Sequence, residues 1–253
     1  MPTYVITGAS SGLGLEMVKQ LSARGEKVYA TCRKKACSAN GEDYISAVPG
    51  DVTIIEGIDV TSDGCGEVLA KALAGVTIDV LVHNAGSVNA TREVEGMGIF
   101  GEQKLDAVSM ERMMSTFNLN TLGPLRVQKA LNAQMASPGG KVAVISTGFG
   151  SIGDNSSGGM YAYRVSKAGV NMVAKNFSCD LKEKGVAVVS VNPGMVQTHF
   201  GPGPEAMGKM GAMPVEKSVE GLIQVFDQLS METTGSYMMV YKDKPPAPFP
   251  GGW

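Results

Sequence analysis

Short apolar runs alternate along the chain with segments in which apolar residues recur every three or four positions. The runs have the length of buried β-strands, and the periodic segments have the pattern of helices with one buried face. The predicted strands are Tyr4–Thr7, Lys27–Cys32, Thr53–Asp59, Ile78–His83, Lys141–Ser146, Val186–Asn192 and Tyr237–Tyr241. The predicted helices are Leu13–Arg24, Gly66–Ala74, Val215–Leu229, one from Ser109 to about Met135 with a disturbance at Gly123-Pro124, and one that carries Tyr163 and ends at Gly185.

Several of the predicted strands are almost entirely apolar, as a sheet covered on both faces requires. Strict alternation with helices then predicts an α/β fold of Rossmann type, a doubly wound and mostly seven-stranded parallel sheet with helices on both faces. No internal repeat or linker divides the chain, so we expect one domain over residues 1–253. Ser87–Ala107 and His199–Met213 have no clear period and are interpreted as loops, and Pro245–Trp253 as a proline-rich tail.

Composition narrows the classes of function. The chain has 253 residues, 43% of them hydrophobic, and a net charge of −2, which argues against a nucleic-acid partner. No apolar run reaches the roughly 18 residues that a membrane span needs. No targeting signal is visible, so we expect a cytoplasmic protein, and an organellar location after removal of a transit peptide stays open.

The four cysteines and two histidines do not indicate a metal site. Cys32, Cys37, Cys65 and Cys179 show no C-x-x-C spacing, and neither histidine clusters with them. We therefore predict free thiols in a reducing compartment and no metal. His83 ends a strand and is interpreted as a packed core residue, while His199 is interpreted as a loop residue.

A glycine-rich turn separates the first strand from the first helix, in the sequence Thr7-Gly8-Ala9-Ser10-Ser11-Gly12-Leu13-Gly14. In a Rossmann fold this junction binds a pyrophosphate, because glycines let the backbone approach and the helix N-terminus supplies N–H groups and positive potential. The spacing here is G-x-x-x-G-x-G rather than G-x-G-x-x-G. A tight turn without a ligand is the alternative interpretation.

The end of the second strand indicates which dinucleotide binds. An acidic residue about 20 positions beyond the glycines would bind the ribose hydroxyl of NAD. Residues 30–41 contain no Asp or Glu, and they do contain Arg33, Lys34 and Lys35. A guanidinium pairs well with a 2′-phosphate, so we expect NADP(H) to be favoured over NAD(H), with Arg33 as the leading contact.

The stretch Tyr161–Lys167 carries the candidate chemistry. Tyr163 and Lys167 are four residues apart, which places both side chains on one face of a helix. A nearby ammonium favours phenolate, so we expect Lys167 to lower the pKa of Tyr163 and make it an acid/base group. On its own, Tyr-x-x-x-Lys is more often a surface helix pair.

Together and in order, these motifs resemble those of the classical short-chain dehydrogenases/reductases, over about residues 3–200 and on to the last strand. Within that family, Ser151–Arg164 resembles the carbonyl reductases similar to sniffer and to the bacterial C-factor protein. The resemblance implies a catalytic set of Asn120, Thr147, Tyr163 and Lys167, with Asn120 holding a water in the proton relay. It implies cofactor contacts from Gly8, Ser10, Ser11, Gly12, Leu13, Gly14, Arg33, Asp59, Val60, Asn84, Ala85, Gly86, Tyr163, Lys167, Pro193, Gly194, Val196 and Thr198.

One position departs from the family pattern. The family has Ser-Ser-x-x-Gly after the fifth strand, and this chain has Ser146-Thr147-Gly148-Phe149-Gly150. By register the catalytic hydroxyl falls on Thr147, whose methyl group narrows the pocket. Ser146 is the alternative if the register slips.

The resemblance implies an NADPH-dependent oxidoreductase that reduces a small carbonyl compound to an alcohol, or the reverse, and that pairs into a homodimer or homotetramer. Two alternatives stay open: a dinucleotide-binding signalling or sensor protein with little turnover, and an enzyme for a specialised alcohol such as a steroid, sugar or pigment. We expect substrate choice to lie in residues 87–107 and 199–213, where Met207, Met210 and Met213 either line a lid or dock it. Trp253 either caps a neighbouring surface or is disordered.

Overall fold

Eight strands form one sheet in the order β3-β2-β1-β4-β5-β6-β7-β8. The computed structural model describes residues 1–34, 45–88, 98–200 and 202–253. The strands are β1 (Thr3–Ile6), β2 (Lys27–Thr31), β3 (Val52–Ile55), β4 (Val80–His83), β5 (Lys141–Ile145), β6 (Ala187–Asn192), β7 (Ser236–Met239) and β8 (Ala247–Pro248). The first seven pair in parallel, which confirms the predicted Rossmann-type sheet.

The sheet extends from β1 in both directions. Val5 of β1 is in register with Tyr29 of β2 on one side and with Leu81 of β4 on the other. The first three strands therefore spread one way and the later strands the other, so the strand order reverses between β1 and β4. In open α/β sheets, ligands bind beyond the carboxyl ends of the strands at such a point.

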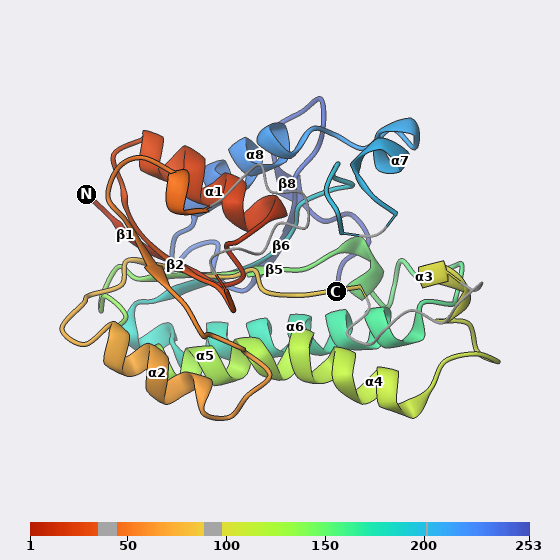
Figure 1. The fold of residues 1–253 in the computed structure, drawn as a ribbon, viewed down its shortest axis with the longest axis horizontal. Helices are drawn as coiled ribbons and strands as arrows, with labels where there is room; N and C mark the ends of the chain where they lie inside the picture. Colours follow the sequence, from red (N-terminus) through yellow and green to blue (C-terminus); the bar gives the residue numbers. More distant parts are fainter. Residues whose placement is uncertain (35–44, 89–97, 201) are drawn as a thin grey trace.

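Helices cover both faces of the sheet (Figure 1). α1 and α8 lie on one face, while α2, α5 and α6 lie on the other, with α4 alongside α6 (Figure 1). The helix bounds are α1 (Gly12–Ala23), α2 (Cys65–Ala72), α3 (Gly98–Gly101), α4 (Met110–Phe117), α5 (Gly123–Leu131), α6 (Tyr161–Asp180), α7 (Pro204–Lys209) and α8 (Val215–Gln228).

The strands bury side chains on both faces, as their apolar sequences predict. Tyr4 and Ile6 pack into the core beneath α1 and α8, while Val5 between them packs into the core on the opposite face. Alternate residues of a strand point to opposite sides. Both cores therefore depend on the same short strands, and one polar substitution in β1 would disturb one of the two layers.

The long helix predicted from Ser109 to about Met135 is interrupted. α4 ends at Phe117, one π-helical turn η2 (Asn118–Leu122) follows, and α5 then begins at Gly123. Pro124 has no N–H with which to continue the α-helical bonding, which accounts for the predicted disturbance. π-Turns occur frequently at functional sites, and this one contains Asn120.

Three segments interpreted as structureless contain regular structure. α3 lies within residues 87–107, α7 lies within residues 199–213, and the tail forms the antiparallel edge strand β8 against β7. α7 begins with Pro204 followed by Glu205, a favourable first turn that carries no apolar period. The sheet therefore has eight strands, because the edge of β7 offered unpaired backbone groups that the tail satisfies.

His83 is a packed core residue, as predicted. It is 2% exposed, its Nε2 lies 3.2 Å from Gln128 Oε1, and its ring lies 6.0 Å from that of Phe177. Burial lowers the pKa of His83 to about 4. Among the described cysteines, Cys65 and Cys179 are free thiols.

The burial of His83 predicts a pH-dependent loss of stability. The pKa is lower in the folded chain than in the unfolded chain, so the free energy of unfolding should fall as pH drops from about 6.5 to about 4. We expect this contribution to be about 3 kcal/mol. Urea titrations of the wild type and of His83→Gln across this range should show a shallower pH dependence in the variant. His199→Gln, at the other and exposed histidine, is the matched control, and parallel curves for wild type and His83→Gln would contradict the assignment.

Candidate active site

The glycine-rich turn is held against the end of β4. Thr7 Oγ1 accepts hydrogen bonds from the backbone N–H groups of Asn84 (3.0 Å) and Ala85 (3.1 Å). A Cβ atom at Gly8, where φ is +66°, would lie 2.7 Å from Ala85 Cα. Only glycine fits that approach. The first strand–helix junction and the Asn84-Ala85-Gly86 segment are therefore one unit.

Asn84 fixes the shape of this turn from the side. Its Nδ2 donates to the carbonyl oxygens of Thr7 (2.9 Å) and Gly8 (3.0 Å). A Cβ atom at Gly14 would lie 2.3 Å from the Gly8 oxygen and 2.6 Å from Asn84 Nδ2. This packing leaves no room for a side chain, so the turn has a single compact shape.

The turn has the features that a dinucleotide phosphate needs. α1 begins at Gly12, and the side chain of its N-cap residue Ser11 makes no capping hydrogen bond. The N–H groups of the first turn thus remain available for an anion. A Cβ atom at Gly12, where φ is +54°, would lie 3.7 Å from Thr198, so the turn faces the segment after β6. Ser10 and Leu13 are half-buried beside it.

Arg33 stands exposed just after β2, near Asp59. The pKa of Asp59 is lowered, first by a hydrogen bond from the Thr61 side chain and also by the charge of Arg33. Asp59 Oδ1 accepts from Thr61 N (2.9 Å) and Thr61 Oγ1 (2.6 Å), so this carboxylate is already engaged. Val60 is buried, and a Cβ atom at Gly123 would lie 2.8 Å from it. Lys34 is exposed, and Lys35 lies outside the described residues.

Asn120 connects the end of β4 to α6. Its Oδ1 accepts from Ser87 N (2.9 Å), and its Nδ2 donates to Ser87 O (2.8 Å) and to Ser166 Oγ (2.9 Å). A Cβ atom at Gly86 would lie 3.0 Å from Asn120 Oδ1 and 3.7 Å from Lys167 Nζ. Asn120, Gly86 and Lys167 therefore lie next to one another, as expected if all three belong to the predicted site.

Tyr163 and Lys167 are both buried on α6, 6% and 5% exposed. Lys167 Nζ donates to the carbonyl oxygen of Ile145 at 2.9 Å and lies 5.9 Å from the centroid of the Tyr163 ring. The Thr147 side chain lies near the Tyr163 phenol and acts to lower its pKa. Burial distinguishes this pair from an ordinary surface pair at the same spacing.

The structure separates Thr147 from Ser146. Ser146 Oγ donates to Asn171 Oδ1 at 2.6 Å, within a buried group that also contains Ser190. Adjacent residues at a strand end point to opposite sides, so Thr147 alone meets Tyr163. The geometry agrees with the register that places the reacting hydroxyl on Thr147.

The prediction that Lys167 lowers the pKa of Tyr163 is wrong for the protein chain by itself. Burial raises the pKa of Tyr163 above its ordinary value, the Thr147 side chain opposes that rise, and Tyr237 adds to it. Burial also lowers the pKa of Lys167 to about 8. Desolvation penalises the charged form of each group and is the largest cause of both shifts.

The segment after β6 is shaped by close backbone packing. Gly194 has φ +80°, and a Cβ atom there would lie 2.6 Å from Met213 Cε. Val196 forms a parallel bridge with Met213, and the carbonyl of Pro193 accepts from Ser218 Oγ at 2.8 Å. Met213 is buried and docks this segment, whereas Met210 is 58% exposed and Met207 half-buried. Gly201 lies outside the described residues.

Sequence reasoning missed Gln103, which holds the start of α6. Its Oε1 accepts from the backbone N–H of Tyr163 at 2.9 Å, and its Nε2 donates to the Val88 carbonyl at 2.9 Å. Gln103 is completely buried. It lies in a segment without periodicity, so no local signal could have identified it.

Two phenylalanines beside Tyr163 were also missed. The Phe149 ring lies 6.3 Å from the Tyr163 ring, and the Phe200 ring lies 5.9 Å from it. Their exposed fractions are 42% and 40%. Exposed aromatic rings next to a reactive group are suited to contact an apolar ligand.

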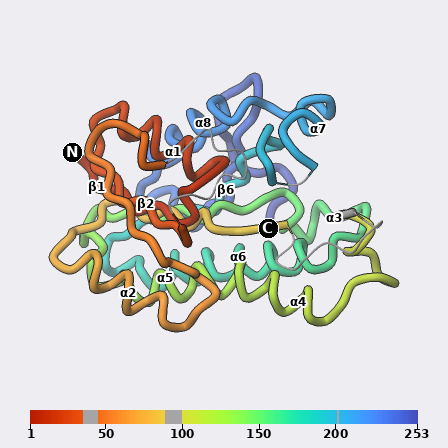
Figure 2. Tube along the Cα trace, viewed as in Figure 1, coloured from red at the N-terminus to blue at the C-terminus, as the bar shows by residue number. Residues whose placement is uncertain are grey.

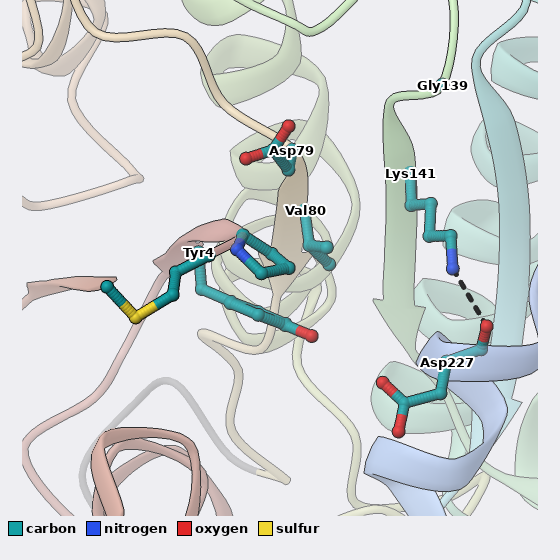
Figure 3. A pocket seen from close by; sticks show the side chains of 8 residues that line it. Tyr4, Asp79, Val80, Gly139, Lys141 and Asp227 are labelled. Carbon is teal, nitrogen blue, oxygen red and sulfur yellow. Dashed lines mark hydrogen bonds between the residues drawn. The ribbon is translucent and has the colours of Figure 1, made fainter. Parts of the chain in front are cut away.

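A separate hollow of about 440 Å³ lies at the amino ends of β1, β4 and β5. Figure 3 shows Lys141 pointing across it to the backbone oxygen of Asp227, a hydrogen bond of 2.9 Å. Lys141 also donates to the Phe226 oxygen at 2.7 Å, which ties the end of α8 to the sheet. This hollow is at the opposite end of the strands from Thr147, so its contacts are structural and play no part in the site.

Among the described residues, no helix is long and apolar enough to cross a membrane. Within the same ranges, no group of three or more His, Cys, Asp or Glu side chains is arranged to hold a metal ion.

The raised pKa of Tyr163 predicts that this phenol keeps its proton in the protein alone. The difference in 295 nm absorbance between wild type and Tyr163→Phe during an alkaline titration should show no phenolate from Tyr163 below pH 10, the ordinary tyrosine value. Burial is the cause, since the charged form would lose its hydration. A phenolate difference signal near neutral pH would restore the lysine-lowered assignment.

Comparisons with known proteins agree with this geometry. A 1-hydroxy-2-glutathionyl-2-methyl-3-butene dehydrogenase of Rhodococcus sp. (strain AD45) is 35% identical over 94% of this chain and 96% of its own length. A short-chain dehydrogenase/reductase of Burkholderia multivorans, solved with bound NADP, superposes with a TM-score of 0.76 at 28% identity over 96% of this chain and 98% of that one.

The carbonyl reductase Sniffer of D. melanogaster superposes with a TM-score of 0.78 at 26% identity over 98% of this chain and 100% of that one. This similarity confirms the resemblance found in Ser151–Arg164. The short chain dehydrogenase family matches residues 2–204. The chain belongs to the short-chain dehydrogenase/reductase family of oxidoreductases.

Proposed function

We propose that this protein uses NADPH to reduce an aldehyde, ketone or quinone to the alcohol, or runs the reverse reaction. The observation that carries the proposal is the burial of Tyr163 and Lys167 side by side on α6, with the Thr147 side chain near the Tyr163 phenol. This group lies at the carboxyl ends of the strands, where the glycine-rich turn and the Asn84-Ala85-Gly86 segment would hold a dinucleotide.

NADPH, when bound, supplies the hydride. The turn Gly8–Gly14 would hold its pyrophosphate, Arg33 its 2′-phosphate, Asp59 and Val60 its adenine, and Lys167 its nicotinamide ribose. Pro193, Gly194, Val196 and Thr198 would border the nicotinamide carboxamide. The uncapped first turn of α1 and the glycines that admit no side chain support this assignment.

The protein's own residues handle the oxygen of the carbonyl. The hydroxyl groups of Thr147 and Tyr163 donate hydrogen bonds to that oxygen as it gains negative charge, and Tyr163 then transfers its proton. Burial keeps Tyr163 protonated, which suits a proton donor in the direction of reduction. Lys167, with a pKa near 8, and Asn120 lie behind it as the route by which the proton is replaced.

The walls of the site favour an apolar or aromatic carbonyl compound. Phe149 and Phe200 flank Tyr163 on two sides and keep about two-fifths of their surface exposed. Covering them with an apolar group would contribute at roughly 25 cal/mol per Å² of area removed from water. The methyl group of Thr147 adds a further apolar surface and narrows the space for the carbonyl.

A second candidate is the oxidation of an alcohol that carries an anionic group. The Rhodococcus relative is named for a glutathionyl alcohol and matches nearly the whole chain. In this chain, Arg164 Cζ lies 4.6 Å above the Phe149 ring, and Arg164 Nε is buried without a hydrogen-bond partner among the described residues. A guanidinium on the aromatic wall is a suitable anchor for a carboxylate.

The same geometry argues against the alternative that the protein is a dinucleotide-binding signalling or sensor protein with little turnover. A protein that only binds a dinucleotide has no need for a buried tyrosine beside a buried lysine. Burying the ionisable side chains of Tyr163 and Lys167 costs desolvation free energy. A catalytic role gives a reason for this cost, whereas dinucleotide binding alone does not.

Turnover tests the proposed function. Purified protein should oxidise NADPH in the presence of some members of a panel of aldehydes, ketones and quinones, and the reverse reaction should be assayed with glutathionyl alcohols. Tyr163→Phe should lower kcat by about 10²–10⁴-fold, the usual contribution of a positioned acid/base group, while NADPH binding stays within about twofold. Turnover that survives in Tyr163→Phe would refute the mechanism.

Three variants at the neighbouring positions serve as controls in the same assay. Thr147→Ser keeps the hydroxyl and should retain most activity, whereas Thr147→Val should lose about 10²–10³-fold in kcat. Ser146→Ala should mainly lower stability, because it removes one hydrogen bond to Asn171. A larger loss of kcat in Ser146→Ala than in Thr147→Val would transfer the role to Ser146.

Cofactor choice is predicted to depend on Arg33. Arg33→Ala should raise the KM for NADPH by about 10-fold or more and leave that for NADH nearly unchanged, since a charged hydrogen bond to phosphate contributes about 1.5–3 kcal/mol. The measurement is kcat/KM for both nucleotides, with Lys34→Ala as the matched control on the adjacent residue. An equal loss with both nucleotides would show that Arg33 does not contact the 2′-phosphate.

A further inference from the structure

The C-terminal tail folds back onto the loop that carries the proposed catalytic hydroxyl. We call Ala247–Trp253 the tail and Thr147–Asp154 the catalytic loop. Ile152 N donates to the backbone oxygen of Trp253 at 3.2 Å, and Ser151 Oγ donates to that of Gly251 at 3.1 Å. Figure 2 shows the C-terminus near the middle of the view, between the labels of β6 and α6, while the N-terminus lies at the left edge.

Tyr237 on β7 connects the two segments. Its hydroxyl donates to the carbonyl oxygen of Thr147 at 2.5 Å. Its ring packs between two tail aromatics, 4.8 Å from the Phe249 ring and stacked at 5.3 Å on the Trp253 ring. Phe249 N donates to Tyr237 O at 2.8 Å, so the tail is paired to β7 by its backbone as well. One residue thus contacts the tail with its ring and Thr147 with its hydroxyl.

The tail and the catalytic loop fit together closely. A Cβ atom at Gly148 would lie 3.2 Å from the Phe249 ring, and one at Gly251 would lie 2.6 Å from Asp154 Cβ. A Cβ atom at Gly153 would lie 3.1 Å from the Gly251 oxygen. Glycines therefore occupy the contact points on both sides, and neither segment can shift toward the other.

We propose that Tyr237 and the tail act as a positioning clamp on Thr147, so that the C-terminal residues control the rate of the reaction without touching the substrate. The proposal rests on the proposed function, because it concerns the hydroxyl that would hold the carbonyl oxygen. Tyr237 holds the carbonyl of Thr147, and the Thr147 side chain lies near the Tyr163 phenol. An error of about 1 Å in such a group costs on the order of 100-fold in rate.

The surroundings of Tyr237 suit a permanent donor. It is 5% exposed, and the Ser146 and Asn171 side chains act to lower the pKa of its hydroxyl. Burial raises the pKa of Tyr237 to about 12, so the hydroxyl keeps its proton over the working range of an enzyme. The contact to Thr147 is therefore present whatever the pH of the assay.

The chain offers a direct optical probe, because Trp253 is its only tryptophan. Emission and acrylamide quenching of Trp253 report whether the tail stays on Tyr237. Four variants separate the parts of the clamp: Tyr237→Phe removes only the hydroxyl, Trp253→Ala removes the stacked ring, Trp253→Phe restores an aromatic ring, and a chain without residues 247–253 removes the tail. Tyr241→Phe, two residues beyond β7, is the matched control.

We expect Tyr237→Phe, Trp253→Ala and the tail deletion each to lower kcat by about 10- to 100-fold, with the Kd for NADPH and the KM for the carbonyl within about threefold. Trp253→Phe should recover most of kcat, and Tyr241→Phe should match the wild type. Tyr237→Phe should leave Trp253 quenching unchanged, because the ring stack persists. A kcat within twofold of the wild type in both Tyr237→Phe and the tail deletion would overturn the proposal.

Hydrogen exchange keeps the clamp testable if the wild type reduces no carbonyl compound, a result that would reject the proposed function. The clamp predicts that deletion of the tail speeds exchange at least tenfold at the amides of Gly150, Ser151 and Ile152. Exchange in α8, on the other face of the sheet, should not change. Unaltered exchange in the catalytic loop of the deleted chain would overturn the clamp irrespective of turnover.

Discussion

The site depends on the contact between the buried face of α6 and the carboxyl end of β5. Lys167 Nζ donates to the Ile145 carbonyl at 2.9 Å, and Tyr163 lies near the side chain of Thr147, two residues further along. A Cβ atom at Gly150 would lie 2.9 Å from the backbone of Lys167, so the helix can approach this closely only over a glycine. A side chain at position 150 would push α6 outward and move Tyr163 away from Thr147.

Burial has an electrostatic consequence that matters for function. The same enclosure that aligns Tyr163 and Lys167 raises the pKa of the phenol and lowers that of the ammonium to about 8. Both groups are thereby biased toward their neutral forms, because a charge loses hydration inside the protein. A neutral tyrosine is a proton donor, which suits the reduction of a carbonyl, whereas oxidation of an alcohol would need added positive charge to generate the phenolate.

Supports for this contact come from distant parts of the chain. Gln103 holds the start of α6, Asn120 in the π-turn joins it to the end of β4, and Tyr237 with the tail holds Thr147 from the other side. The aromatic walls and Arg164 then lie around a fixed centre. Gln103 and Tyr237 make these contacts through a backbone N–H and a backbone carbonyl, whereas Asn120 reaches α6 through the Ser166 hydroxyl.

The sequence by itself determined the order of strands and helices, the glycine-rich turn, the tyrosine–lysine pair and the family, because each rests on residues close together in the chain. It also placed His83 in the core. Tertiary structure alone decided that Thr147 rather than Ser146 faces Tyr163, that burial outweighs Lys167 in setting the Tyr163 pKa, and that Gln103 and the tail belong to the site. These features depend on desolvation and on contacts between residues up to about a hundred positions apart, such as Ser151 with Trp253, which leave no local pattern to read.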